Sequence, residues 1–420
     1  MDLLRELRER GLVYQVTDEG LGELLAKEKV TLYAGFDPSA ASLHVGNLLH
    51  LVTLRRFQLA GHRPIAIAGG ATGMIGDPSG KSTERNLLAT EEVEANLVRQ
   101  SEQMRRILDF EGANGARILN NADWLGKFSF LEFLRDVGKH FSVPNMLAKD
   151  SVKSRLAGGI SFTEFAYALL QAYDFLHLFE EYGCRLQIGG QDQWGNITAG
   201  VELIRRKTGQ SAYGLTSELI TTSSGAKFGK SEGNAVWLDG KMTSPYQFYQ
   251  FWVRTEDADV VNYLKQFTLL ELEEIEGLAG EVKQEPQRRT AQKRLAEHMT
   301  EMVHGKEASQ TAKRASEVLF GSQIKDLTDE LIREIFREVP SSELAAGRLA
   351  GGIDIVEALT ETGTAPSKSE ARRLLKSGAV YVNNVRVEEA EYKLTPKDLA
   401  SEHFAVLRTG KKNYRLLRFE

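Results

Sequence analysis

The stretch VTLYAGFDPSAASLHVGNLLHLVTLRRFQLAG, residues 30–61, sets the fold of the first half of the chain. Its first seven residues, VTLYAGF, form a short apolar run and predict a buried strand. From Asn47 onward the apolar residues follow a helical pattern. A strand that leads into a helix is the repeating unit of a parallel α/β sheet.

Three further strand patterns follow this first unit, and helical patterns separate them. They are PIAIAGGAT (64–72), ARILNN (116–121) and CRLQIGG (184–190). The alternation predicts a doubly wound, parallel-sheet α/β domain of the Rossmann-like type. Ligands of such domains bind beyond the carboxyl ends of the strands, where this sequence places glycines and polar residues.

The composition is that of an ordinary globular protein. The chain has 420 residues, of which 42% are hydrophobic and 26% charged, with a formal net charge of -5. This length predicts two or three domains, and the charge gives no global sign of a nucleic-acid partner. Cys184 is the only cysteine, which excludes a disulfide framework and favours a reducing, cytoplasmic location.

Changes in composition predict the domain boundaries. A Gly/Ser/Lys-rich loop interrupts the α/β pattern, a charged helical region follows it, and a small α+β module ends the chain. In that module, a capped helix stops at Gly378 and a hairpin is predicted to turn at Asn383 and Asn384. The expected divisions are a catalytic domain (1–220), a loop and connection (221–245), a helical domain (246–335), a linker (336–350) and the terminal module (351–420).

The segment MIGDPSGKST (74–83) resembles a P-loop but has the wrong spacing. A P-loop needs four residues between its two glycines, and only three lie between Gly76 and Gly80. The missing residue matters because the loop works by aiming successive backbone N–H groups at one phosphate chain. An ordinary P-loop ATPase or kinase is therefore excluded.

The helix predicted over SFTEFAYALLQAYDFLHLF (161–179) is mostly apolar but carries one polar stripe. Tyr167, Gln171 and Asp174 lie at positions i, i+4 and i+7, which share one helix face. Buried polar groups must find partners, so the stripe either forms a network between helices or lines a pocket. With Tyr33 and Asp77, a pocket would suit a small zwitterion that carries a hydroxyl group.

Two other segments have the character of phosphate-binding elements. His44 and Asn47 lie at the start of the first helix, where the helix dipole and unpaired N–H groups favour anions. KFGKS (227–231) places two lysines and a serine on a loop. Each alone is a weak signal, and Lys81 and Arg85 alone would be surface cations. Their order along the chain, with the GDPSGKSTER turn between them, is more informative.

Together these segments resemble the class I aminoacyl-tRNA synthetases, and among them the bacterial tyrosyl-tRNA synthetases, over the whole chain. YAGFDPSAASLHVGN resembles the HIGH region and KFGKS resembles the KMSKS loop, although Asn47 replaces the last HIGH histidine. GGATGMIGDPSGKSTER, TEFAYALLQAYDF and LQIGGQDQWGNI are similar to stretches particular to the tyrosine enzymes. The resemblance implies ATP-dependent activation of tyrosine and its transfer to tRNA(Tyr).

The resemblance also implies a role for each site residue. Tyr33 and Asp174 would hold the phenol hydroxyl, and Asp77, Tyr167 and Gln171 the ammonium group, with Gln193 near the carboxylate. The residues implied for ATP or its ribose are Gly35, Asp37, Gly190 and Asp192. His44 and Asn47 would contact the phosphates. Those facing pyrophosphate would be Ser39, Lys81, Arg85, Lys227, Lys230 and Ser231. Magnesium is expected on the ATP phosphates, with no dedicated metal site on the protein.

The terminal module resembles an S4-type RNA-binding domain. Its candidate RNA-binding residues are Arg372, Arg373, Lys376, Lys411, Lys412 and Arg415. Arg408 and Arg418 add charge, interleaved with Tyr414 and Phe419. Clustered cations of this kind suit phosphate contacts, although a solvated basic face would look the same. The resemblance further implies a homodimer, and the apolar stretch 128–143 with Phe162 is the expected interface.

Three other functions remain open from the residues alone. A tryptophanyl-tRNA synthetase would share the class motifs but would not need Tyr33 and Asp174 as hydroxyl partners. A nucleotidyltransferase unrelated to tRNA would not need the basic terminal module. A non-catalytic RNA-binding protein would not need an ATP pocket.

Overall fold

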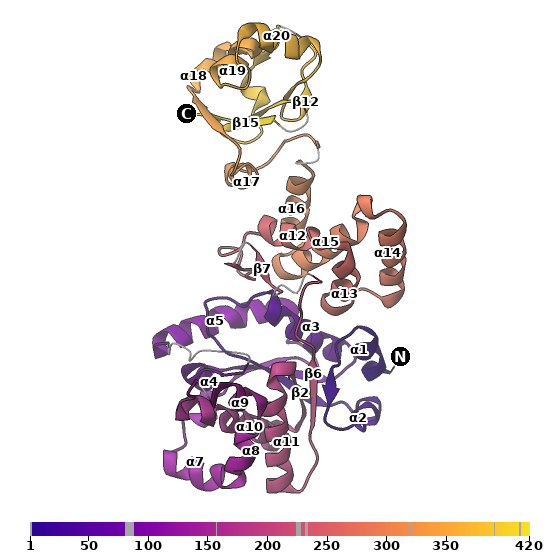
Figure 1. Cartoon of the computed structure of the whole chain (residues 1–420), viewed down its shortest axis with the longest axis vertical. Helices are drawn as coiled ribbons and strands as arrows, with labels where there is room; N and C mark the ends of the chain where they lie inside the picture. The colour runs from indigo at the N-terminus through magenta and orange to yellow at the C-terminus, as the bar shows by residue number, and fades with distance from the viewer. Residues whose placement is uncertain are drawn as a thin grey trace. The chain divides into compact units, whose positions relative to one another are not determined.

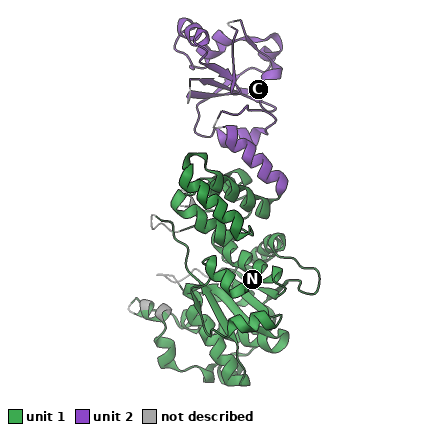
Figure 2. Ribbon diagram, turned by 90° about the vertical axis from the view of Figure 1, so that its right-hand side faces the viewer, with its two compact units in different colours: residues 1–305 green, residues 306–420 purple. Residues whose placement is uncertain are grey.

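The computed structural model describes residues 2–79, 88–156, 158–223, 228–231, 234–318, 321–389, 391–410 and 413–420. For residues 150, 151, 154, 230, 231 and 234 it describes the backbone only. The chain forms two compact units, Met1–Gly305 and Lys306–Glu420 (Figure 2). No helix in the described ranges is long and apolar enough to cross a membrane.

The first unit is built on a six-stranded sheet in the order β1-β6-β5-β2-β3-β4 (Figure 1). The strands are β1 (Gln15–Val16), β2 (Thr31–Phe36), β3 (Arg63–Ala68), β4 (Arg117–Asn120), β5 (Cys184–Gly190) and β6 (Tyr213–Ser217). Strands β2 to β6 run parallel, which confirms the predicted doubly wound α/β architecture. The short edge strand β1 is antiparallel to β6, so the sheet is mixed.

The strand predictions need two corrections. The strand expected over 64–72 ends at Ala68, and Gly70 begins the short helix α4 (Gly70–Ile75). β1 and β6 were not predicted. Strand β1 has only two residues, which is too short for an alternating pattern to be visible in the sequence. It is stabilised by its pairing with β6.

Helices pack on both faces of this sheet, as a doubly wound fold requires. On one face, α10 (Phe162–Tyr182) and α11 (Trp194–Thr208) share a hydrophobic core with Tyr33, Ile65 and Ile67. Helices α3 (Val45–Leu59) and α5 (Thr90–Ile107) also pack against β3. Figure 1 shows them on the opposite side of the sheet from α10 and α11. Ser161 caps the amino end of α10, because its Oγ accepts from Glu164 N at 3.2 Å.

The strand order fixes where a ligand can bind. Strands β2 and β5 are neighbours at the centre of the sheet. From β2 the chain continues outward through β3 and β4, and from β5 it continues in the other direction to β6. Such a reversal of strand order leaves a crevice at the carboxyl ends of the two central strands.

The remainder of the first unit is helical. Its helices are α12 (Pro245–Val253), α13 (Asp257–Phe267), α14 (Leu272–Gln284) and α15 (Thr290–His304). Helix α15 packs against α12, α13 and α14, and buried residues such as Leu295 and Met299 form its inner face. The compact unit ends at Gly305, whereas the expected helical domain extends to residue 335.

The second unit holds α16 (Lys306–Val318), α17 (Asp329–Ile335) and a five-stranded sheet in the order β12-β11-β14-β15-β9. These strands are β9 (Ser341–Leu344), β11 (Val380–Val382), β12 (Val385–Arg386), β14 (Phe404–Thr409) and β15 (Asn413–Phe419). Helices α18 (Gly347–Gly351), α19 (Ile355–Glu361) and α20 (Lys368–Lys376), together with the pair β10 (Ile353–Asp354) and β13 (Lys393–Leu394), complete it.

Two expectations for this unit have different outcomes. The β11–β12 hairpin turns at Asn383 and Asn384, as predicted, and both residues have positive φ angles. The expected linker 336–350, however, contains β9 and most of α18. Strand β9 pairs in parallel with β15, so this polar segment is ordered by a partner about seventy residues away.

We predict that Gly200→Ala destabilises the first unit. A Cβ at Gly200 would lie 2.9 Å from Phe175 Cδ1, so α10 and α11 would have to move apart at the point where α10 carries Asp174. The expected loss is about 1–3 kcal/mol of unfolding free energy. Gly277→Ala in α14 is the matched control, because no atom lies within 4 Å of the added Cβ. It should stabilise by about 0.5–1 kcal/mol. Urea denaturation of both variants measures the difference, and equal effects would contradict the packing argument.

Candidate active site

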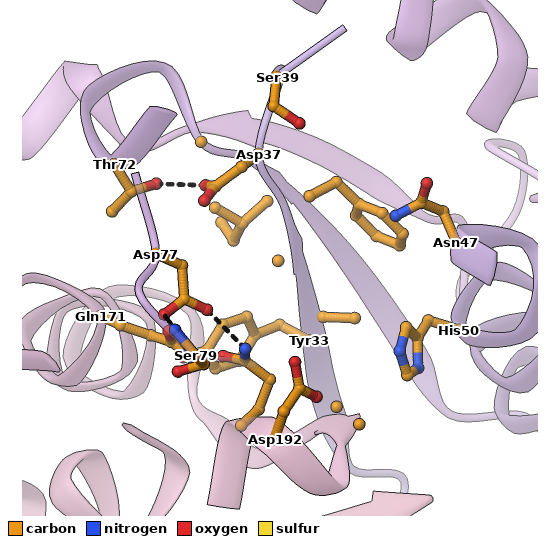
Figure 3. A pocket seen from close by; sticks show the side chains of 18 of the residues that line it. Tyr33, Asp37, Ser39, Asn47, His50, Thr72, Asp77, Ser79, Gln171 and Asp192 are labelled. Carbon is orange, nitrogen blue, oxygen red and sulfur yellow. Dashed lines mark hydrogen bonds between the residues drawn. The ribbon is translucent and has the colours of Figure 1, made fainter. Parts of the chain in front are cut away.

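A cavity of about 460 Å³ opens at the carboxyl ends of the central strands, where the strand order reverses. Residues from β2, β5, α3, α10 and the α4 region line it (Figure 3). The site residues predicted from the sequence and found in this lining are Tyr33, Gly35, Asp37, Ser39, His44, Asn47, Asp77, Tyr167, Gln171, Asp174, Gly190, Asp192 and Gln193. The polar stripe on α10 therefore lines a pocket.

The deep end of the cavity holds Tyr33 and Asp174. Both side chains are buried, and Tyr33 Oη has no hydrogen-bond partner among the residues that the structure describes. The carboxylate of Asp174 accepts from Trp124 Nε1 at 2.7 Å and from Asn121 Nδ2 at 3.0 Å. A buried phenol without a partner is costly, so this end of the cavity is suited to a ligand that offers a hydrogen-bonding group.

Burial shifts the ionisation of both groups. Desolvation raises the pKa of Asp174 to about 7, although the hydrogen bonds from Asn121 and Trp124 oppose this rise. Burial also raises the pKa of Tyr33 well above its ordinary value, and the nearby Asp174 charge adds to this effect. The phenol of Tyr33 is therefore neutral at physiological pH and can donate a hydrogen bond.

A second polar cluster surrounds Asp77. One carboxylate oxygen accepts from Gln193 Nε2 at 2.6 Å and the other from Ser79 N at 2.9 Å. Asn196 Nδ2 donates to Gln171 Oε1 at 3.0 Å. These bonds fix Asp77 and Gln171 on the cavity wall, where an amide oxygen and a carboxylate can together accept from an ammonium group.

Asp37 at the end of β2 links α4 to α10. Its carboxylate accepts from Thr72 Oγ1 at 2.9 Å and from Tyr167 Oη at 3.0 Å (Figure 3 shows the bond to Thr72). Burial raises the pKa of Tyr167 well above its ordinary value, and Asp37 contributes to the rise. The hydroxyl of Tyr167 therefore stays protonated, and its hydrogen bond to Asp37 holds that carboxylate in place.

The amino end of α3 forms another part of the wall. His44 is the N-cap, and its Nδ1 accepts from Gly46 N at 3.0 Å, while Asn47 Oδ1 accepts from His44 N at 3.1 Å. This reciprocal capping fixes both predicted side chains at the helix start. One turn further along, His50 also lines the cavity (Figure 3), and burial lowers its pKa to about 4. His50 is therefore uncharged at neutral pH.

The described lining is negatively charged. It contains the carboxylates Asp37, Asp77, Asp174 and Asp192, and no lysine or arginine stands among its described residues. Burial raises the pKa of Asp192, and the charge of Asp77 raises it further. A cluster of this kind attracts a cationic group such as an ammonium. The predicted cations Lys81, Arg85 and Lys227 lie outside the described residues. Lys230 and Ser231 form strand β7 (Lys230–Ser231), of which the backbone alone is described.

The sequence analysis missed several residues of this site. They are His50, Thr72, Trp124 and Asn196. Asn121 and Gln187 were expected only as polar residues at the ends of the strands over 116–121 and 184–190, without a role in the site. Asn121 and Trp124 were hidden because they do not line the cavity themselves. From the segment after β4, Trp124 bonds to Asp174, and Asn121 bonds to Asp174, Thr72 and the backbone of Ala71. Asn196 stands three residues after Gln193, and that helical spacing is the one signal that could have identified it.

The candidate RNA-binding residues lie in the second unit. Arg372, Arg373 and Lys376 are exposed on α20, and Arg373 pairs with Glu370 at 2.7 Å. Arg415 is half-buried on β15, and Lys411 and Lys412 lie outside the described residues. Of the two aromatic residues expected among these cations, Tyr414 is half-buried, and its ring centroid lies 5.8 Å from the guanidinium carbon of Arg408 and 5.7 Å from the ring centroid of Phe336. Phe419 instead belongs to the hydrophobic core.

Comparisons with known proteins agree over both units. The family model for tRNA synthetases class I (W and Y) matches residues 25–321, and that for the tyrosine–tRNA ligase SYY-like C-terminal domain matches 331–417. The chain is 56% identical to the tyrosine–tRNA ligase of Geobacillus kaustophilus and 52% identical to tyrosine–tRNA ligase 1 of Bacillus subtilis, over the full length of each. A C-terminally truncated mitochondrial tyrosyl-tRNA synthetase of Aspergillus nidulans is 34% identical, with a TM-score of 0.70 over 76% of this chain and 94% of that one.

We predict that the stability difference between the wild-type protein and Asp174→Asn depends on pH. The folded-state pKa of Asp174 is raised from 3.8 to about 7, so the stability that this group contributes is fully present below pH 3.8. It is lost as the pH rises through about 7, because ionisation of the buried carboxyl then opposes folding. Asparagine does not ionise, so the variant should gain stability relative to wild type between these pH values. Denaturant unfolding across this range measures the difference, and a constant difference would contradict the raised pKa.

Proposed function

The chain belongs to the class I tRNA synthetases and, within them, to the tyrosine–tRNA ligases, and from this membership we propose how its site performs the reaction. The enzyme activates L-tyrosine with ATP and transfers the tyrosyl group to tRNA. The observation that carries the assignment of roles is the buried phenol of Tyr33, which shares one cavity with the carboxylate of Asp174 and finds no hydrogen-bond partner in the described part of the chain.

Tyrosine binds with its side chain toward Tyr33 and Asp174. The substrate hydroxyl donates to Asp174 and accepts from Tyr33, which satisfies the one unpartnered phenol at that end. Trp124 and Asn121 already occupy other directions around the carboxylate and hold it toward the cavity. Phenylalanine would leave these buried polar groups unpaired, and that cost provides the selectivity.

The ammonium group of tyrosine binds against Asp77, Tyr167 and Gln171, and the carboxylate lies near Gln193. The surplus of carboxylates in the described lining supports this orientation, because a cation offsets their mutual repulsion. The hydrogen bonds among Asp77, Gln193 and Asn196 hold these groups in place before the substrate arrives. Such preorganisation lowers the cost of ordering the site on binding.

The nucleotide occupies the part of the cavity lined by Gly35, Asp37, Gly190 and Asp192. At Gly35, no atom lies within 4 Å of the position of a Cβ, so the backbone is open to close approach by a ligand. His44 and Asn47, at the amino end of α3, contact the phosphates. The segments proposed to face pyrophosphate carry Ser39, Lys81, Arg85, Lys227, Lys230 and Ser231.

The chemistry requires positioning rather than a general base. The tyrosine carboxylate is already ionised when it attacks the α-phosphorus of ATP, and pyrophosphate leaves. A terminal ribose hydroxyl of tRNA then attacks the carbonyl of tyrosyl-adenylate. Charge builds up on the phosphate oxygens, and side-chain donors aimed at that charge lower the barrier. Mg²⁺ bound to the ATP phosphates would add to this stabilisation. Because Mg²⁺ prefers phosphate oxygens and water, no protein cage is needed to hold it.

The second unit and the helical region 246–335 are proposed to bind tRNA. Exposed Arg372, Arg373 and Lys376 on α20, with Arg415, Lys411 and Lys412 near the end of the chain, supply the cations. The salt dependence of tRNA binding tests this proposal. Removing one phosphate contact should reduce the slope of log K against log salt by about 1. An unchanged slope for Lys376→Ala and Arg372→Ala would exclude these residues.

We also propose that the enzyme is a homodimer located in the cytoplasm. Large apolar side chains lie exposed within the expected interface, among them Leu131 at 76% and Phe162 at 66%. Exposed apolar surface of this kind favours a protein partner. Sedimentation equilibrium of the wild type and Leu131→Glu tests the dimer.

The free, buried Cys184 is compatible with the reducing conditions of the proposed cytoplasmic location, and cell fractionation tests that location.

Amino-acid-dependent ATP–pyrophosphate exchange tests the function. We expect exchange with tyrosine and not with phenylalanine or tryptophan. Tyr33→Phe should lower the ratio of the tyrosine to the phenylalanine rate roughly tenfold, because one hydrogen bond to the substrate hydroxyl is lost. Tyr14→Phe, at an exposed position, is the control and should leave the ratio unchanged. Exchange driven by tryptophan alone would overturn the assignment.

A further inference from the structure

One stripe of helix α13 carries three buried residues that differ in chemistry. Asp259, Tyr263 and Phe267 lie at positions i, i+4 and i+8, which place them on one helix face. Their exposed fractions are 8%, 5% and 0%. None of them belongs to the cavity described above, so the stripe must serve another purpose than substrate binding.

Asp259 holds the chain just before the KFGKS segment. Its carboxylate accepts from Ser223 N at 3.1 Å on each oxygen and from Ser223 Oγ at 3.0 Å. A buried carboxylate is costly unless it is hydrogen-bonded. The described partners that satisfy this one belong to Ser223, so the backbone at Ser223 is fixed to α13.

The other two residues hold Phe228, the second residue of KFGKS. The ring of Phe228 lies 5.0 Å from that of Tyr263 and 5.1 Å from that of Phe267, measured between centroids. Phe251 and Trp252 of α12 close the cluster from the other side. Phe228 is only 9% exposed, so its burial among four aromatic rings anchors the loop.

The residue after this anchor lies against the amino end of α3. A Cβ at Gly229 would be 2.9 Å from Val45 Cγ2, and Gly229 O accepts from Val236 N at 2.9 Å. Val236 O in turn accepts from Val45 N at 3.0 Å. The backbone that leads into Lys230 is therefore held between α13 and the helix start that carries His44 and Asn47.

The far ends of the same two helices are also joined. Arg56 near the end of α3 donates to Lys265 O at 3.1 Å and to Thr268 O, at the carboxyl end of α13. Arg10 donates to Leu270 O at 2.9 Å. The end of α3 is therefore bound to the carboxyl end of α13, while the start of α3 lies against Gly229. These contacts fix the stripe on α13 relative to the end of the cavity proposed to hold the nucleotide.

We propose that Phe228 and Asp259 are positioning residues for adenylate formation. Ser223 and Phe228 are held on one face of α13, and Phe228 fixes the backbone at the start of β7, from which Lys230 is proposed to act on the phosphates. Neither residue touches the substrate. This inference rests on the proposed role of Lys230. A misplacement of about 1 Å at such a group lowers the rate by about a hundredfold.

The test compares Phe228→Leu and Asp259→Asn with matched controls. Each should lower the single-turnover rate of tyrosyl-adenylate formation by about tenfold to a hundredfold and change the tyrosine dissociation constant by less than about twofold. Phe248→Leu and Asp257→Asn should leave both values unchanged. Phe248 packs on Trp252 and His304. Asp257 lies in the same turn of α13 as Asp259 and accepts from Gln292. Phe228→Met should restore most of the rate, since methionine can fill the aromatic cluster.

A double-mutant cycle with Lys230→Ala decides whether Phe228 acts through that lysine. In the Lys230→Ala background, Phe228→Leu should cause little further loss of rate. Additive losses would overturn the inference. It would also be overturned if Phe228→Leu and Phe248→Leu lowered the rate and the melting temperature to the same extent. If Lys230→Ala alone keeps the wild-type rate, the proposed role of Lys230 fails instead. The two failures are therefore distinguishable.

Discussion

The site depends on the buried carboxylate of Asp174. Placing a carboxylate in a low-dielectric interior costs free energy, and no described cation offsets this charge. The structure compensates with two donors, Trp124 and Asn121, which are held by the segment after β4. No described residue forms a hydrogen bond with the neighbouring phenol of Tyr33. A folded protein tolerates such an arrangement at a binding site, because the ligand completes it.

The two halves of the cavity differ in how they are built. At the end proposed to hold the amino acid, carboxylates accept hydrogen bonds from neighbouring amide and phenol groups, as the pairs Asp77–Gln193 and Asp37–Tyr167 show. At the end proposed to hold the nucleotide, the wall is formed by the capped start of α3 and the open backbone at Gly35. This division suits a reaction in which the amino acid is selected by hydrogen bonds and the nucleotide is bound through its charged phosphates. Selectivity requires rigid, desolvated partners, whereas phosphoryl chemistry requires donors aimed at developing charge.

Helix α3 connects the cavity to the helical part of the first unit. Its first turn lines the site, and its last turn carries Arg56, whose guanidinium binds carbonyl groups at the end of α13. Burial is the main reason that the pKa of Arg56 falls to about 9, so this contact is made at a desolvated position. The carbonyl groups of a helix end carry partial negative charge, and a guanidinium there satisfies acceptors that the helix leaves unpaired. The packing of α13 is thereby coupled to the geometry of the site.

The sequence by itself determined the fold class and about half of the residues that line the cavity. The periodic patterns of strands and helices are local properties of the sequence, and the carboxyl ends of neighbouring parallel strands meet at one edge of the sheet. These two facts were enough to predict one pocket that contains Tyr33, Asp77 and Asp174. Only the tertiary structure decided which polar atoms pair. Asn121 and Trp124 reach Asp174 from about fifty residues away, and β9 is a strand only because β15 lies beside it. Hydrogen bonds depend on distances of a few tenths of an ångström between elements far apart in the chain, and no local pattern encodes those distances.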